Sequence, residues 1–448
     1  MKKAYLAIFA FTAFSMVVAG QGLTLRQCVE FANSNNGNIK NATLDIQIAD
    51  KKIDEQSGTM LPQIEGTSTY TNNLQLPTTI LPGSFNQKNP GTPLAVTMGI
   101  KQNFSGSIQL NQKLFDPTFD VALKAVKITK AQAIQSKRKS LEQTAYAICG
   151  IYYQTLVIGK QIATLHTTME AAQKSLEATE LKFRNGMAKK VDVDKIKVSY
   201  NNIKSQSQQS ELSYLQSLNN LKYQMGMTVE TPLILSTDAI DGDIRLFEMP
   251  ENNFSIDNRV DYQLQKISLS AYELDKKRHK DSYLPTLTFN ANLGLQAMRQ
   301  EFDFFKTDGN WYPNSSVGVT LKVPIFDGLQ KQARISQAQL NIQRSKISIQ
   351  QTEEAIKVDL SNNDIQYRNA IDNIKNEKDN LDLAESVYKN FQNQFKQGIC
   401  STLDLVQAQS SYSESQNIYY NKLLTLYIAR INLEQTKGTL INYINNQR

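Results

Sequence analysis

The sequence predicts a mostly α-helical protein with a smaller β portion, built as a duplicated helix–β-hairpin–helix repeat. Three observations support this fold class. A glycine turn with the same flanking residues occurs twice, mostly apolar residues precede each turn at a step of seven, and four short segments alternate polar and apolar residues. These patterns are typical of a duplication, of a coiled-coil seam and of half-buried strands, respectively.

The two copies of the turn lie 212 positions apart. A glycine at the centre of the turn suits the left-handed conformation that ends a helix without strain. We therefore predict two repeats, residues 21–226 and 257–440, each containing a long helix, a tight turn and a second helix that runs back. The matched residues are Phe183 and Phe395, Gly186 and Gly398, Asp192 and Asp404, Tyr200 and Tyr412, Leu221 and Leu433, and Gly226 and Gly438.

The step of seven predicts long coiled coils, because it keeps one helix face on its partner along a left-handed supercoil. The expected helices are 116–183 and 189–226 in the first repeat, and 327–396 and 401–437 in the second. The longer helix of each pair would extend roughly 100 Å. The repeated positions are Ile148, Thr155, Ile162, Met169, Leu176 and Phe183, opposite Leu360, Tyr367, Ile374, Leu381, Tyr388 and Phe395.

Residues 1–20 predict a signal peptide for export. Lys2 and Lys3 carry positive charge, residues 4–18 are apolar, and Ala19 and Gly20 supply the small residues of a cleavage site. The apolar segment is too short for a comfortable transmembrane span. The mature chain is expected to begin near Gln21, and no cysteine stands there to carry a lipid anchor.

Each repeat is expected to open with a helix that ends at a Leu-Pro pair. These helices are 24–61, with Thr24 as its N-cap, and 257–284. After each proline the period changes to two, which predicts one β-hairpin within 62–115 and another within 285–326. The apolar positions are Val96, Met98, Ile100, Phe104, Ile108 and Leu110, then Leu287, Phe289, Ala291, Leu293, Leu295 and Ala297, and finally Val317, Val319, Leu321, Val323 and Ile325.

Aspartates mark the return from strand to helix in both halves, with Asp116 and Asp327 as the expected N-caps. Between the repeats, residues 227–256 lose both periods and predict a non-helical connector. Residues 441–448 predict a polar, loosely held tail.

The loop of the second hairpin is rich in aromatic residues. Aromatic side chains beside a strand end can form a belt at a membrane surface. An ordinary cluster of loop side chains is the alternative. The residues are Phe302, Phe304, Phe305, Trp311 and Tyr312.

The sequence lacks the common motifs of metal and nucleophilic catalysis, namely HExxH, paired CxxC, a nucleophile elbow and a Walker loop. We expect no catalytic residue, no metal site, no cofactor and no enzymatic activity. Cys28, Cys149 and Cys400 are scattered, and are expected to be packing residues or free thiols. The net charge of +7 is spread along the helices, so no nucleic acid partner is expected.

The predicted strands imply an assembly. Four strands cannot close a barrel, and an open strand edge cannot face lipid because its backbone groups would lack hydrogen-bond partners. Bacterial barrels start at about eight strands, so subunits must pool theirs, as a dimer with eight or a trimer with twelve. The alternative is a structural or adhesive coiled-coil envelope protein without transport activity.

The order of these elements resembles the TolC-like outer membrane efflux proteins. The resemblance rests on the signal peptide, the duplicated helix–hairpin–helix order, the Leu-Pro and Phe-Asp transitions, and the two glycine turns, and it covers nearly all of residues 21–440. It implies a homotrimer in the outer membrane that extends into the periplasm. The strands would form a shared twelve-stranded barrel, the helices a long α-barrel, and the whole a passive exit duct. The implied partners are outer membrane lipid, a periplasmic adaptor and an inner-membrane efflux pump.

The same resemblance implies where the adaptor docks. The two glycine turns would be the periplasmic tips of the helical barrel. The expected adaptor-docking residues are Gly186, Met187, Gly398 and Ile399.

The resemblance also implies a periplasmic gate formed by Phe395, Asp404, Gln407 and Asp192. Asp404 falls where the family often places an acidic constriction ring, which would favour cations and raise the carboxyl pKa values. The alternative is an aspartate that stabilises the start of the helix that follows the turn. Some relatives have a second aspartate where this chain has Gln407, and a tyrosine and an arginine where it has Phe395 and Cys400. We therefore expect the closed tip to be held mainly by Phe395 packing.

Overall fold

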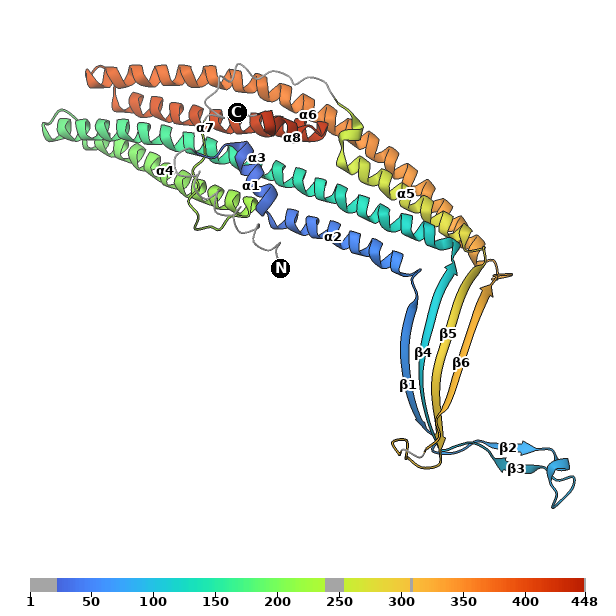
Figure 1. Ribbon diagram of the computed structural model, residues 1–448. Coiled ribbons are helices and arrows are strands. Elements are labelled where there is room, and N and C mark those ends of the chain that lie inside the picture. The colour runs from blue at the N-terminus through green and yellow to red at the C-terminus, as the bar shows by residue number, and fades with distance from the viewer. Residues whose placement is uncertain (1–21, 238–253, 307–308, 447–448) are drawn as a thin grey trace, which may run out of the picture. The chain divides into compact units, whose positions relative to one another are not determined.

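The computed structural model describes residues 22–237, 254–306 and 309–446. The predicted signal peptide and residues 238–253 of the predicted connector lie outside this range. The chain divides into two compact units (Figure 1). Among the described residues, the helical unit comprises 22–46, 132–237, 254–267 and 345–446, and the strand-containing unit comprises 47–131, 268–306 and 309–344.

The strand-containing unit is centred on one antiparallel sheet with the order β1-β4-β5-β6. The strands are β1 (Gln63–Asn72), β4 (Gln102–Phe115), β5 (Thr286–Arg299) and β6 (Tyr312–Lys322). Residues paired across the ladder point to the same face, so the register defines two faces. Ile108, for example, pairs with Gly66 on one side and with Leu293 on the other.

The two faces differ in chemistry, as the alternation predicts. One is mainly apolar and includes Ile64, Phe104, Ile108, Leu110, Leu287, Phe289, Leu293, Leu295, Val317, Val319 and Leu321. The other carries amides and hydroxyls, including Thr67, Thr69, Asn103, Ser105, Ser107, Gln109, Asn290, Asn292, Gln296, Asn314, Ser316 and Thr320. Amides hydrogen-bond across this polar face, for instance from the Asn290 side chain to Thr320 Oγ1 at 3.0 Å and from Gln296 to Asn103 at 3.1 Å.

The first hairpin differs from the expectation at its loop end. The alternation from Val96 to Leu110 reads as one strand, but the chain leaves the ladder before Gln102 and forms a separate two-stranded sheet. That sheet pairs β2 (Thr78–Leu81) with β3 (Leu94–Thr97), and a short 3-10 turn, η1 (Gly83–Phe85), lies between them. The interruption coincides with Gly99, whose φ of 133° is incompatible with an extended strand.

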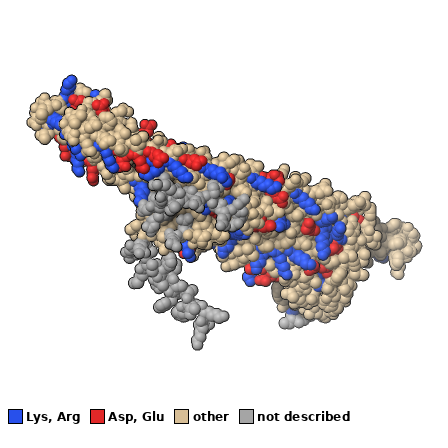
Figure 2. Space-filling view, turned by 90° about the horizontal axis from the view of Figure 1, so that it is seen from above, with Lys and Arg blue, Asp and Glu red and all other residues tan. Residues whose placement is uncertain are grey.

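The helical elements follow the expected order closely. They are α1 (Leu25–Asn35), α2 (Gly37–Gly58), α3 (Pro117–Arg184), α4 (Lys190–Met225), η4 (Ile256–Asn258), α5 (Val260–Asp281), α6 (Gln330–Lys396), α7 (Thr402–Lys437) and α8 (Leu440–Asn446). Among the described residues, no helix is both long enough and apolar enough to span a membrane. On the face seen in Figure 2, acidic and basic residues are interspersed along the helices. Several form pairs four residues apart, such as Arg368 with Asp364 at 2.8 Å.

The expected single helix 24–61 is two helices, which corrects the prediction. Thr24 is the N-cap of α1, because its hydroxyl accepts from the Gln27 N–H and the Gln27 side chain accepts from the Thr24 N–H. Asn36 then adopts an extended conformation between α1 and α2. Its side chain accepts from the Asn38 N–H at 2.8 Å and donates to the Gln224 carbonyl at 2.7 Å. The tertiary bond to α4 explains why the helix breaks there.

The start of α6 also differs from the expectation. Helix 327–396 was expected to begin at Asp327, whereas α6 begins at Gln330. Gly328 and Leu329 have left-handed φ values of 65° and 64°. These values are incompatible with a right-handed helix, so α6 begins only after both residues. Asp327 still accepts a hydrogen bond from the Lys331 N–H at 2.9 Å. Its counterpart Asp116 accepts from the Thr118 N–H at 3.0 Å, directly before α3.

The predicted polar tail is wrong for residues up to 446. Gly438, with a φ of 72°, ends α7, and α8 then packs into the core of the helical unit. Leu440 and Ile444 lie four residues apart on one face of α8 and are buried. Ile441 and Tyr443 of the same helix are partly buried against this core. The core contains side chains of α1, α3, α4, α6, α7 and α8, and includes a stacked pair, Tyr153 and Tyr427, with ring centroids 4.2 Å apart.

Candidate functional site: two glycine turns between long helices

The first glycine turn connects α3 to α4 within the helical unit. The Gly186 N–H donates to the Phe183 carbonyl at 2.9 Å, and the Met187 N–H donates to the Lys182 carbonyl at 2.7 Å. This pair of bonds is a Schellman motif, which satisfies carbonyls at the helix end. It requires a left-handed residue at its centre, and Gly186 has a φ of 74°.

The second turn, between α6 and α7, repeats the first bond for bond. Gly398, with a φ of 77°, donates to the Phe395 carbonyl at 3.1 Å, and Ile399 donates to the Gln394 carbonyl at 2.9 Å. Met187 and Ile399 occupy the same position in the two turns and each is 71% exposed. The duplication therefore presents an exposed apolar side chain at the same position of both turns.

Both candidate gate aspartates cap helices. The Asp404 carboxylate accepts from the Ser401 N–H at 3.1 Å and from the Ser401 hydroxyl at 2.6 Å, while the Asp404 N–H donates to the Ser401 hydroxyl at 3.2 Å. Asp192 accepts from the Lys189 N–H at 3.2 Å. Each aspartate therefore lies in the first turn of its helix, where negative charge is stabilised.

The hydrogen bonds from the Ser401 side chain and backbone lower the pKa of Asp404 below its usual value of 3.8. This lowering of the Asp404 pKa, which arises within one chain, is opposite in direction to the rise in pKa expected from a ring of carboxylates. The Asp404 side chain is fully exposed, so its negative charge is available to solvent down to acidic pH.

Phe395 distinguishes the second turn from the first. It is only 7% exposed, whereas its counterpart Phe183 is 41% exposed. Phe395 belongs to a small core with Ile196 of α4, Tyr388 of α6 and Leu405 of α7. This core joins the two helical hairpins near their turns.

Lys182 of α3 provides a link that the sequence did not reveal. Its Nζ lies 4.8 Å from the centre of the Phe395 ring and donates to the Phe395 carbonyl at 3.3 Å. The contact ties the end of the first long helix to the end of the second. At the duplication offset Lys182 corresponds to Gln394, so the repeat pattern carried no signal for this contact.

Two other candidate residues lie around the second turn. Cys400 is half-buried and directs its thiol toward the Phe391 carbonyl at 3.3 Å. Burial, with a smaller contribution from Asp404, raises the pKa of this thiol. Gln407 is exposed one turn after Asp404. The structure thus gathers Phe395, Cys400 and Asp404 at one turn, with Asp192 at the other.

A polar groove runs between α4 and α7, beyond the two turns. Its volume is about 350 Å³, and its walls include Asn202 and Ser413. Hydrogen bonds cross the seam, including Gln206 to Asn417 at 3.0 Å. Gln409, which is 4% exposed, also lines the groove, and its Nε2 has no hydrogen-bond partner among the described residues. Neutral polar side chains therefore supply hydrogen bonds across this part of the seam.

The described residues contain no group of three or more His, Cys, Asp or Glu side chains arranged to hold a metal ion. The turns offer exposed apolar side chains, a lowered-pKa carboxylate and a link between hairpins.

We expect Lys182→Met to loosen the second turn, because it removes one hydrogen bond and one cation–π contact. Together these are worth about 1 kcal/mol, so backbone amide exchange over residues 395–400 should rise by roughly 5-fold. Lys195→Met, at an exposed position of α4, is the matched control and should leave the exchange unchanged. Equal exchange in both variants would show that the Lys182 contact does not hold the turn.

The chain is similar in sequence to known outer membrane efflux proteins. A sequence profile described as outer membrane efflux protein matches residues 29–227 and 255–439. Outer membrane protein TolC of Salmonella enteritidis is 20% identical over 459 residues, covering 98% of this chain and 87% of that protein. Outer membrane efflux protein BepC of Brucella suis is 21% identical over 411 residues, covering 88% of this chain and 81% of its own length.

A solved structure shows the same fold at lower identity. The Campylobacter jejuni CmeC outer membrane channel superposes with a TM-score of 0.70 at 14% identity, and the match covers 93% of this chain and 86% of that one.

Proposed function

Because the chain belongs to the outer membrane efflux protein family, it is an outer membrane channel of an efflux or secretion system, and we propose that three copies form that channel together. In this proposal the polar faces of the sheets line a shared barrel and the apolar faces meet lipid. The helices extend the duct into the periplasm.

The observation that carries the proposal is the sheet itself. Within the described part of the chain, its edge strands β1 and β6 each pair on one side only, and its apolar face exposes large side chains such as Ile64, Leu293 and Val319. Unpaired strand edges are not tolerated in lipid, so β6 of one copy must pair with β1 of the next. Two copies would give eight strands and three would give twelve, both within the range of bacterial barrels, and we propose three because of the resemblance to the TolC-like proteins. Light scattering of the purified protein in detergent tests this stoichiometry, since a single-chain mass would contradict the shared barrel.

We further propose that the duct is passive. The polar sheet face consists mainly of neutral amides and hydroxyls, which suit the passage of varied hydrated substrates rather than chemistry on one of them. Energy for export would come from an inner-membrane pump, and a periplasmic adaptor would join the pump to this channel.

The adaptor would dock at the two glycine turns. Support comes from the exposed Met187 and Ile399, which the duplication places at equivalent positions. In a trimer these would form a ring of six apolar side chains, since each chain supplies two. Apolar side chains surrounded by polar surface are common anchors at interfaces. The polar groove lies further along α4 and α7, beginning at Ser199 and Gln409.

The gate would combine one contact between hairpins with one ring of charged side chains. Lys182 and Phe395 would hold the hairpins of one chain together in the closed state. Asp404 would supply a charged ring at the constriction, with its charge maintained by Ser401. Gln407 is exposed one turn further on, and would contribute no charge.

Asp404→Asn should reduce the preference of the channel for cations and weaken block by multivalent cations in single-channel recordings. Asp192→Asn is the matched control and should have a much smaller effect. Equal effects would mean that both aspartates line the pore, and no effect from either would exclude Asp404 from the constriction.

The hydrogen bonds from Ser401 to Asp404 predict how cation preference depends on pH. They lower the pKa of Asp404, so cation preference should persist as pH falls and disappear only below the usual pKa of 3.8. Ser401→Ala removes the hydroxyl bond and should move this loss to higher pH. A variant with an unchanged pH profile would show that the Ser401 cap does not govern the charge.

A further inference from the structure

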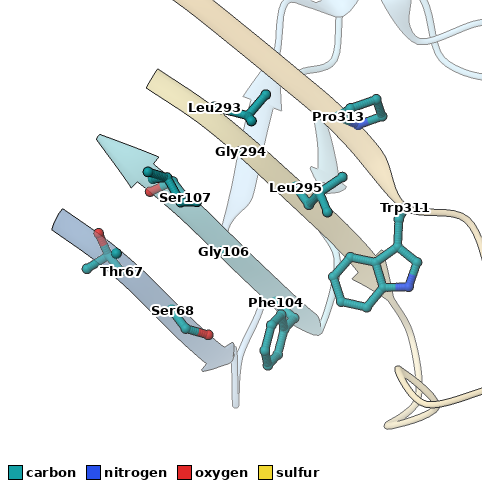
Figure 3. Close-up of a pocket in the computed structure, with 12 residues that line it drawn as sticks. Thr67, Ser68, Phe104, Gly106, Ser107, Leu293, Gly294, Leu295, Trp311 and Pro313 are labelled. Atoms are coloured by element: carbon teal, nitrogen blue, oxygen red, sulfur yellow. The ribbon is translucent and has the colours of Figure 1, made fainter. Parts of the chain in front are cut away.

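The apolar face of the sheet contains a hollow of about 610 Å³ (Figure 3). This volume lies within the roughly 300–1,000 Å³ typical of small-molecule sites. The lining is mostly carbon and comes from β1, β4, β5 and the segment that enters β6. All of these residues belong to the strand-containing unit.

Glycines create the hollow. Along β4, the positions that face the apolar side run Phe104, Gly106, Ile108, so one side chain is missing between two large ones. The neighbours of Gly106 and Ile108 on β1 are Ser68 and Gly66, which are also small. A Cβ atom built at Gly66 or Gly106 would meet nothing within 4 Å, so neither glycine is required by packing.

The walls are large apolar side chains held in place by their neighbours. Leu293 and Leu295 of β5 stand along one side, and Trp311 lies at the loop end (Figure 3). The Trp311 ring centroid is 5.6 Å from that of Phe104, in an edge-to-face arrangement. Phe104 also contacts Phe304, at 5.7 Å between centroids.

The loop that carries this aromatic wall is fixed by Arg299. Its guanidinium lies 5.7 Å from the centre of the Phe304 ring and pairs with the Asp303 carboxylate at 3.2 Å. Phe304 is 3% exposed, although it lies in a loop. The end of the hollow is therefore built in advance of any occupant, which lowers the entropic cost of binding.

We propose that the hollow binds one acyl chain of a membrane lipid. The site is continuous with the apolar face that meets lipid in the proposed function, and the inference rests on that assignment. Its lining is mainly apolar, and the hydroxyl-bearing residues that contribute to it are Thr67, Ser68 and Ser107. A flexible hydrocarbon chain suits an apolar depression, because each CH₂ group buried there is removed from water.

The single tryptophan of the chain makes the test direct. Since Trp311 lines the hollow, its fluorescence reports the occupant. Purified channel in detergent would be titrated with a phospholipid that carries dibrominated acyl chains, because bromine quenches tryptophan on contact. We expect saturable quenching that approaches one lipid per chain.

Gly106→Val and Gly66→Val fill the hollow and should raise the lipid concentration for half-quenching at least 10-fold. Gly318→Val is the matched control, because Gly318 is also in open space but pairs with Asn290 on the polar face. It should bind like the parent. Equal half-quenching concentrations in the parent and both filled variants would overturn the proposal. Two filled variants are used so that misfolding of one does not decide the result.

A second arm separates this inference from the proposed function. In bilayers made wholly of the brominated phospholipid, Trp311 should be quenched in the parent and in all variants, because the face meets lipid in each. Absence of quenching there would reject the lipid-facing assignment itself. Quenching in bilayers without a difference in the detergent titration would reject only the specific site.

Discussion

Gly398→Val should abolish export in cells while leaving an intact trimer in detergent. Gly398 has a φ of 77°, and a β-branched residue is strained in that region by about 1–3 kcal/mol. No atom lies within 4 Å of the added Cβ, so the effect comes from the backbone rather than from a clash. The turn would re-form without its Schellman bonds and would displace Ile399, the exposed side chain proposed to anchor the adaptor.

Gly398→Asn is the matched control, because asparagine tolerates the left-handed conformation. It should export almost normally. Export would be measured as the accumulation of a fluorescent substrate in cells, and assembly by light scattering of the purified protein. A Gly398→Val strain that exports as well as the parent would contradict the docking role of the turn.

Leu293→Arg and Leu321→Arg should weaken stable insertion into the outer membrane. The effect should be larger for Leu293, which lies mid-strand in β5, than for Leu321, which lies next to the end of β6. Leu321 lies on the apolar face of the edge strand β6 and is exposed. Arginine on the lipid face of a barrel costs about 2–4 kcal/mol near the bilayer midplane, and three copies would incur that cost together. Leu293→Arg on β5 tests the same face at a second position.

Thr320→Arg is the control for Leu321→Arg. Thr320 is the adjacent residue, but it pairs with Thr288 on the polar face. The same charge in the aqueous lumen should leave insertion intact and change only conductance. Membrane fractionation followed by urea extraction would compare the three variants. Normal insertion of both leucine variants would show that the apolar face does not meet lipid.

The fold could be predicted from the sequence in those segments where a single periodicity dominates. The duplication located both glycine turns, and the structure gives them the same Schellman bonds. The alternation from Leu287 to Ala297 located β5 and its apolar face for the same reason. Long periodic segments repeat one signal many times, so local exceptions do not obscure it.

The structure differs from the prediction where a tertiary contact or a single residue determines the local backbone conformation. The break at Asn36 depends on a hydrogen bond to Gln224, which is 188 positions away in the chain. Gly99 ends the ladder although the apolar alternation runs through it. The short α8 was missed because its apolar residues Leu440, Ile441, Tyr443 and Ile444 alternate with asparagines over only seven positions, too few to establish a helical period.

The candidate site was only partly predictable. The turns and their exposed residues followed from the repeat, whereas the Lys182 contact with Phe395 breaks the repeat symmetry. A pairing between residues that are not equivalent in the two copies leaves no trace at the duplication offset. The burial of Phe395 and the exposure of Phe183 likewise depend on which hairpin surrounds each side chain.

The most direct test of the central claim is conductance across a planar bilayer. Purified protein extracted from the outer membrane fraction is expected to insert and to produce discrete, uniform current steps with a preference for cations. The Asp404→Asn protein should give steps with a weaker preference. Protein that remains soluble after cell fractionation, or that adds to a bilayer without any current step, would contradict the assignment as an export channel.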